Sequence, residues 1–225
     1  MAEIFAIAID GPSGSGKSTA AKMIAKKLNI TYVDTGAMYR AVGLYCRRKG
    51  IDTKDEASVV TVLDEINITF KVDGDTRRIM LNGEDVTDTI RTQDIGMAAS
   101  DVGAIADVRK KLVKMQQMIA KEQSVVMDGR DIGTVVLKNA QIKIYLDATV
   151  EERTRRRIGE LNEKGIISDF ETIKKEIEER DYNDTHRKVT PLCKAEDAVY
   201  FVNDGMTVDE TSDAIIKIVD ERLGR

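Results

Sequence analysis

The feature that most constrains this chain is a glycine-rich stretch near its start, GPSGSGKST at residues 11–19. It fills the pattern G-x-x-x-x-G-K-[ST] directly after a continuous apolar run, Ile4–Ile9, and directly before a helical repeat of apolar residues that begins near Ser18. A buried strand, a glycine-rich turn and a helix in this order predict a loop whose backbone N–H groups surround a phosphate. They also predict an α/β fold.

The whole loop is expected to bind the phosphates of a nucleotide. Its residues are Gly11, Pro12, Ser13, Gly14, Ser15, Gly16, Lys17, Ser18 and Thr19. In such a loop the lysine, here Lys17, bridges the β- and γ-phosphates, and the hydroxyl of Ser18 is placed on Mg²⁺. A GTP-binding switch would also need a guanine-reading N-K-x-D element after a late strand. The stretches after the late predicted strands, 147–149 and 203–205, do not fit it, which favours an enzyme over a switch.

Short apolar runs alternate with helical patterns along most of the chain, which is typical of a parallel sheet flanked by helices. Five core strands are predicted, at Ile4–Ile9, Ile30–Val33, Ser124–Met127, Ile142–Leu146 and Val199–Val202. Three late helices are expected to begin at the capping boxes Thr149-x-x-Glu152, Ser168-x-x-Glu171 and Thr207-x-x-Glu210.

The middle of the chain has a different pattern. A helix carrying Val59, Val62, Leu63 and Ile66 on one face leads into two short strands near residues 68–72 and 79–81. Asp73-Gly74 and Asn82-Gly83 are turn signals beside them. Antiparallel pieces inside a chain of strands and helices predict a small insertion, at about residues 63–100.

Composition narrows the class of protein. The net charge of −4 argues against a dedicated nucleic-acid binder, and no apolar run approaches the roughly 20 residues that span a bilayer. Cys46 and Cys193 are too few and too far apart for a disulfide framework, as is usual in a cytoplasmic protein. We therefore expect a cytoplasmic protein that binds small molecules, with neither nucleic acid nor membrane as a partner. A monomer is expected, although the sequence does not fix the oligomeric state.

Arginines stand at several ends of the predicted strands and helices. Arg130 lies in the sequence DGRD directly after the third core strand, and Arg40 follows the second. Arg180 and Arg187 flank the end of the helix that begins near Asp169. Ligands of open α/β sheets bind beyond the carboxyl ends of the strands, and planar guanidinium groups suit phosphate. The arginines therefore predict a second, polyanionic ligand.

The candidate site lacks a general base. The single histidine, His186, lies in a polar segment and is interpreted as a surface residue. An acceptor that is itself a phosphate needs no base; it needs alignment and neutralised charge. This combination points to a nucleoside monophosphate as acceptor. The arginines between residues 153 and 157 would form a closing lid, or alternatively a basic helix face paired with Glu151, Glu152 and Glu160.

At this point the chain resembles the bacterial cytidylate kinases along essentially its whole length. The matching stretches are IDGPSGSGKST (9–19), VDTGAMYRA (33–41), LNGEDVTDTIRTQDIGMAAS (81–100), MDGRDIGTVV (127–136), KIYLDATVEERTRRR (143–157) and ERDYNDTHRKVTPL (179–192). The resemblance implies a P-loop NTPase fold: a five-stranded parallel sheet in the order 2-3-1-4-5, a lid, and a small antiparallel β insertion.

The resemblance also assigns roles to individual residues. It implies that Arg40, Arg130 and Arg187 hold the acceptor phosphate, that Ser100, Arg109 and Asp131 read the cytosine, and that Arg180 and Asp184 contact the ribose. Thr35 is expected at the substrate, where part of the family has serine; the hydroxyl is kept. Catalysis is expected to rest on Lys17, Arg130, Arg187, Arg153 and Arg156.

The expected activity is transfer of the γ-phosphoryl group of ATP, with Mg²⁺, to CMP or dCMP. The rivals are another small-molecule kinase of the same fold, of the UMP or shikimate type, and a non-enzymatic nucleotide switch. We expect a single domain over residues 1–225. Its core is 1–34, 101–150 and 190–225, its monophosphate-binding region about 35–100, and its lid about 151–168.

Overall fold

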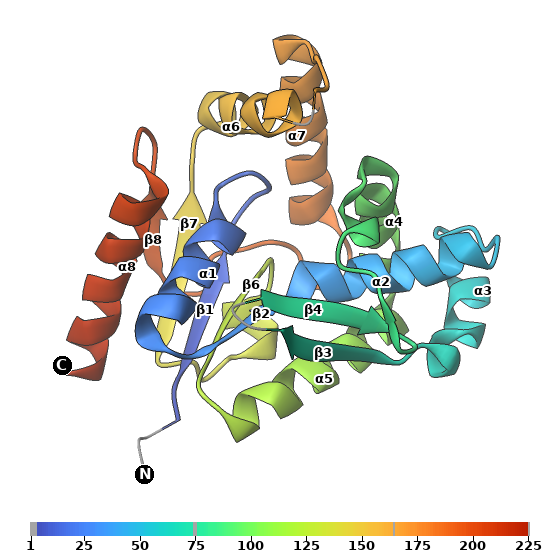
Figure 1. Ribbon diagram of the computed structural model, residues 1–225, viewed down its shortest axis with the longest axis horizontal. Coiled ribbons are helices and arrows are strands. Elements are labelled where there is room, and N and C mark those ends of the chain that lie inside the picture. The colour runs from blue at the N-terminus through green and yellow to red at the C-terminus, as the bar shows by residue number, and fades with distance from the viewer. Residues whose placement is uncertain (1–3, 74–75, 164, 225) are drawn as a thin grey trace. The chain divides into compact units, whose positions relative to one another are not determined.

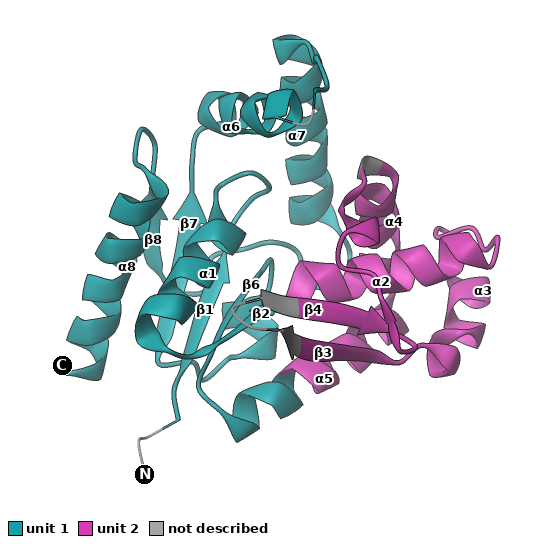
Figure 2. Cartoon of the chain, in the orientation of Figure 1, with its two compact units in different colours: residues 1–33, 117–225 teal, residues 34–116 magenta. Residues whose placement is uncertain are grey.

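The computed structural model describes residues 4–73, 76–163 and 165–224. The chain divides into two compact units, one made of residues 1–33 and 117–225 and the other of residues 34–116 (Figure 2). Each unit has a hydrophobic core of its own. Among the described residues, no helix is long and apolar enough to cross a membrane.

The first unit is built on a five-stranded sheet in the order β2-β6-β1-β7-β8 (Figure 1). The strands are β1 Ala6–Asp10, β2 Thr31–Asp34, β6 Val125–Gly129, β7 Ile142–Asp147 and β8 Val199–Val202. Strand β1 pairs in parallel with β6 and β7, and β7 with β8. Numbered along the chain, these core strands give the predicted order 2-3-1-4-5. Strand β1 begins at Ala6, two residues later than predicted, and Ile4 is half exposed outside the sheet.

Helices flank the sheet of the first unit. They are α1 Lys17–Leu28, α6 Val150–Glu163, α7 Phe170–His186 and α8 Val208–Leu223. Residues of α1 and α8, such as Ile24 and Ile215, share one buried cluster with Ile7 and Ile9 of β1. Helices α6 and α7 lie beyond the carboxyl ends of β1 and β7 (Figure 1). A π-helical turn, Ile132–Val136, follows β6.

The helix starts partly confirm the capping predictions. Both hydrogen bonds of the capping box form at Thr207 and Glu210, at the start of α8. The side chain of Thr149 accepts a hydrogen bond from the backbone N–H of Glu152. The prediction for Ser168 was wrong: Asp169 caps α7 by accepting from the backbone N–H of Thr172, and an aspartate is as good an N-cap as serine.

The second unit contains helices and a small antiparallel sheet. Its elements are α2 Thr35–Arg48, α3 Glu56–Thr61, β3 Ile68–Asp73, β4 Thr76–Leu81, β5 Glu84–Asp85, α4 Gln93–Gly103 and α5 Ala106–Glu122, the last of which runs on into the first unit. The strand order β3-β4-β5 confirms the antiparallel insertion. The turn predicted at Asp73-Gly74 includes Gly74, which lies outside the described residues.

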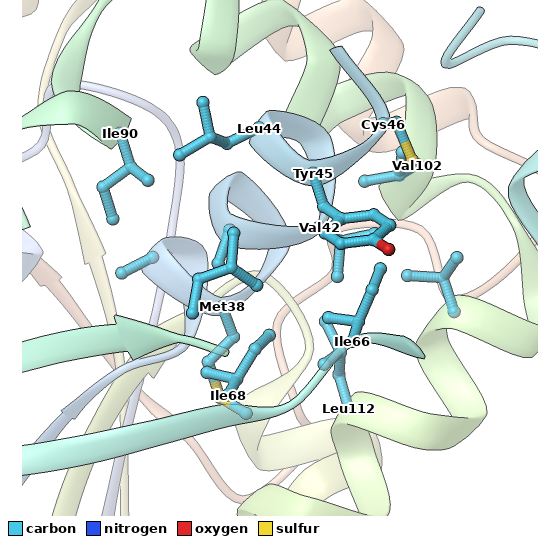
Figure 3. Packing of buried hydrophobic residues seen from close by; sticks show 14 of the residues in the cluster. Met38, Val42, Leu44, Tyr45, Cys46, Ile66, Ile68, Ile90, Val102 and Leu112 are labelled. Atoms are coloured by element: carbon cyan, nitrogen blue, oxygen red, sulfur yellow. The ribbon is translucent and has the colours of Figure 1, made fainter. Parts of the chain in front are cut away.

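The core of the second unit lies around α2. Met38, Val42 and Tyr45 of this helix pack with residues of α4, α5 and β3, including Val102, Leu112 and Ile68 (Figure 3). Helix α4 comes close because Gly43 has no side chain: a Cβ atom there would lie 2.9 Å from that of Ala98. The glycine therefore sets the distance between α2 and α4.

Two elements of the second unit differ from the prediction. The helix that begins at Glu56 ends at Thr61, and its expected continuation is a 3₁₀ turn, Leu63–Glu65, after which Ile66 is extended. Helix α4 was not predicted at all. Its buried residues Ile95, Ala98 and Val102 are nevertheless spaced as on one face of a helix, so the signal was present in the sequence and was missed.

Candidate active site

The predicted phosphate loop connects β1 to α1 in the first unit. Gly11, Gly14 and Gly16 have backbone φ angles of 146°, 78° and 85°, values that residues with a Cβ atom rarely adopt. At Gly11 a Cβ atom would also lie 2.0 Å from the carbonyl oxygen of Leu146. The loop has no side-chain cap at the start of α1. The first N–H groups of that helix and its positive dipole end are therefore suited to an anion.

Lys17 is folded onto the loop that it belongs to. Its ammonium group donates to the carbonyl oxygen of Pro12 at 2.5 Å and to the hydroxyl of Ser15 at 3.2 Å, and the residue is buried. Burial, and next the repulsion of Arg130, lowers the pKa of Lys17 well below its ordinary value. A cation that is buried and repelled in this way is expected to favour an anionic ligand.

Ser18 and Asp128 form a pair of oxygen donors beside the loop. The hydroxyl of Ser18 donates to Asp128 at 2.7 Å, and the other carboxylate oxygen of Asp128 accepts from the hydroxyl of Tyr32 at 2.8 Å. Hydroxyl and carboxylate oxygens are the ligands that Mg²⁺ prefers. The residues present therefore fit the expected ion, with Asp128 standing next to the predicted ligand Ser18.

Asp10 is a residue of the site that the sequence reasoning missed. It ends β1 directly before the loop and is buried, and its two carboxylate oxygens accept from the backbone N–H groups of Ile132 and Gly133, both at 2.7 Å. These bonds hold the turn after the DGRD segment, which carries Arg130 and Asp131. The sequence could have indicated Asp10 as a site residue, because it ends a strand that leads directly into a phosphate loop.

The titration of Asp10 should be visible in the stability of the protein. Burial raises its pKa to about 6, against the lowering effect of the two hydrogen bonds. The folded state then binds more protons than the unfolded state, so this group makes the unfolding free energy fall as the pH rises from about 4 to about 6. We expect denaturant unfolding to show this slope in the wild type and to lose it in Asp10→Asn. Equal slopes in both proteins would contradict the assignment.

Arg130 meets residues of the end of α7, where Arg180 and Arg187 of the predicted arginine site also lie. The guanidinium group of Arg130 donates to Asp184 at 2.7 Å, and both side chains are largely buried. Burial raises the pKa of Asp184, but the positive charges of Arg130, Arg180 and Arg187 outweigh it and hold the pKa below its ordinary value. Arg187 donates to the carbonyl oxygen of Thr190 at 2.7 Å. Arg130 thus contacts this carboxylate, and the charges of Arg180 and Arg187 also act on it.

Two of the predicted lid arginines contact the phosphate loop from α6. Arg153 donates to the carbonyl oxygen of Ser13 at 3.0 Å. Arg156 donates to both oxygens of Asn203, at 3.1 and 2.8 Å, and to the carbonyl oxygen of Ser15 at 3.4 Å. Asn203 also binds Ser15 through its amide, at 3.1 Å, and is a second residue that the sequence reasoning missed. Arg155 and Arg157 pair with Glu152 and Glu160, and Arg156 also pairs with Glu152 at 3.1 Å, as the alternative of a basic helix face expects.

The remaining predicted substrate residues belong to the second unit. Thr35 is buried at the start of α2, Arg40 is half-buried on the same helix, and Ser100 is exposed on α4. Arg109 of α5 is buried; it lies 5.5 Å from the ring centroid of Tyr39 and donates to the carbonyl oxygen of Gly103 at 3.1 Å. In the first unit, Asp131 is buried beside the turn that Asp10 holds.

A parallel sheet in the order 2-3-1-4-5, a loop of the Walker type after its central strand and a cluster of arginines beyond the strand ends define a P-loop kinase. The comparisons with known proteins give the family. The family model for cytidylate kinase matches residues 7–221, so the chain belongs to the cytidylate kinase family.

Curated relatives agree with this assignment over nearly the whole chain. A cytidylate kinase of Caldicellulosiruptor saccharolyticus is 46% identical over 218 residues, covering 97% of this chain and 96% of that protein. One from Streptococcus agalactiae is 50% identical over 204 residues, covering 90% of each.

Among solved structures, an uncharacterized protein from Eubacterium ventriosum has a TM-score of 0.54 at 15% identity, covering 97% of this chain and 99% of its own. A Thermus thermophilus protein has a TM-score of 0.50 at 17% identity, covering 99% of each chain. At these identities the two structures support the fold alone.

Proposed function

We propose that this protein transfers the γ-phosphoryl group of ATP to the phosphate of CMP or dCMP, giving ADP and the diphosphate. Membership of the cytidylate kinase family carries the choice of acceptor. The observation that carries the chemistry is the hydrogen bond from Arg130 to the buried carboxylate of Asp184, in the same unit as the phosphate loop. The positive charges of Arg180 and Arg187 also act on this carboxylate.

The residues of the first unit divide the work between donor and acceptor. The N–H groups of the loop and Lys17 bind the donor phosphates, and Lys17 exchanges the oxygens of Pro12 and Ser15 for those of the nucleotide. Ser18, with Asp128 behind it, would hold Mg²⁺, which neutralises charge on the donor phosphates when bound. Arg130 and Arg187 offset the repulsion between the two anions, so that the acceptor oxygen approaches in line.

The test is a coupled ADP-release assay with Mg-ATP and CMP, dCMP, UMP, AMP, GMP and shikimate as separate acceptors. We expect fast turnover with CMP and dCMP and much slower turnover with UMP. The reason is that Asp131 is expected to accept from the cytosine amino group, and the uracil carbonyl would leave it unpaired at a cost of about 1–3 kcal/mol. Preference for another acceptor would support the assignment as a kinase and refute the assignment of cytosine as the base. Binding of GTP without phosphoryl transfer would refute both assignments.

A further inference from the structure

The guanidinium group of Arg153 is enclosed by protein. It donates to the carbonyl oxygen of Ala148 at 2.9 Å and to that of Ser13 at 3.0 Å, and it forms an ion pair with Asp181 at 2.6 Å. Only 5% of its side chain is exposed. The three partners come from the end of β7, the phosphate loop and helix α7. Arg153 therefore links the phosphate loop to α7, and its N–H groups bind oxygens of the protein.

Asp181 receives this contact on the helix that carries the acceptor residues. It follows Arg180 directly and lies one turn before Asp184 on α7. One of its oxygens pairs with Arg153; the other, Oδ1, is buried and has no hydrogen-bond partner within the described part of the chain. The negative charge of Asp181 also acts on Arg130, whose principal partner is Asp184. Asp181 thus stands between Arg153 and the arginine cluster.

We propose that Arg153 and Asp181 are a positioning pair, which holds the phosphate loop and helix α7 at the separation that in-line transfer requires. The contacts run from the carbonyl of Ser13 through Arg153 to Asp181, and along α7 to Asp184 and Arg130. The inference rests on the proposed function, because it assigns the loop to the donor and α7 to the acceptor. It replaces the catalytic role that the resemblance implied for Arg153.

The close packing of α6 on the loop supports a fixed spacing. A Cβ atom at Gly14 would lie 3.2 Å from the Cβ atom of Arg153, so the backbone of the loop passes directly beside this residue. Transfer between two bound phosphates depends steeply on alignment, and a displacement of about 1 Å can cost about 100-fold in rate. Loss of either charge leaves the other buried without its partner, and we expect the loop or α7 to shift.

The experiment is a double-mutant cycle with Arg153→Met, Asp181→Asn and the combination. Each single variant should lower kcat with Mg-ATP and CMP by about 10- to 100-fold and change either KM less than kcat. The double variant should be no worse than the weaker single variant, because both remove the same link. Asp181→Asn removes the charge and keeps the shape of the side chain, so this variant is expected to fold even if Arg153→Met does not. Lys174→Met is the matched control: it breaks another ion pair between α6 and α7, with Glu151 at 3.0 Å, and should leave kcat unchanged.

Two results would overturn the pairing. If Arg153 touches the transferred group, Arg153→Met is severely impaired, Asp181→Asn is close to wild type, and the effects add. If the pair is only structural, melting temperatures fall while kcat of the folded variants stays the same. The proposed function fails separately: a wild type that prefers another acceptor refutes the choice of CMP, and the same cycle run with that acceptor still tests the pair.

Discussion

Replacement of Arg130 by methionine should lower kcat/KM for CMP by about 10³-fold or more, because a buried arginine that neutralises the transferring phosphoryl group is worth this much in phosphoryl transfer. Its guanidinium group is already oriented by a hydrogen bond to Asp184 at 2.7 Å, so the side chain loses little conformational freedom when substrate binds. Steady-state kinetics with the CMP concentration varied would measure the loss. Near-normal kinetics would rule out the role of Arg130.

Controls separate this catalytic loss from a loss of stability. Removal of Arg130 takes the hydrogen-bonded partner from the buried carboxylate of Asp184, on which Arg180 and Arg187 still act, and costs up to about 3 kcal/mol. The double variant Arg130→Met/Asp184→Asn should recover most of the melting temperature and none of the activity. Arg48→Met breaks an exposed ion pair with Glu84 and should change neither.

Replacement of Lys17 by methionine should lower kcat by about 10²- to 10³-fold, the range found when one charge-stabilising donor is removed from an active site. The melting temperature should change by only a few degrees. The physical reason is that burial disfavours the charged form of Lys17 in the folded state, so its removal relieves that cost while it loses two hydrogen bonds.

The matched control lies on the same helix. Lys27→Met removes an exposed lysine of α1 that pairs with Asp213 at 2.7 Å, and it should keep full activity. A nucleotide-binding titration would show whether Lys17→Met weakens ATP binding together with turnover. Activity within a few fold of the wild type would contradict the assignment of Lys17.

The inner strands of the sheet could be predicted because they are largely buried on both faces, and β1 and β6 read as continuous apolar runs. The phosphate loop could be predicted because the residues that it needs are contiguous. The end of α3 at Thr61 could not be predicted, since the helical spacing of apolar residues continues beyond it to Ile66. Helix α4 was missed although its buried residues have helical spacing. The links of the site that join distant segments were also invisible: Asp10 to Ile132, Asn203 to Ser15 and Arg153 to Asp181 connect residues that only the fold brings together.

The central strand β1 lies between β6 and β7, and the residues of β6 and β7 that pair with it come more than a hundred positions later in the sequence. During synthesis on the ribosome, β1 and the phosphate loop leave the exit tunnel long before either neighbour exists. Residues 34–116 emerge as one uninterrupted stretch with a core of their own. The second unit can therefore fold first, while the edges of β1 stay unpaired until most of the chain has been made, the interval in which aggregation or chaperone binding competes with folding.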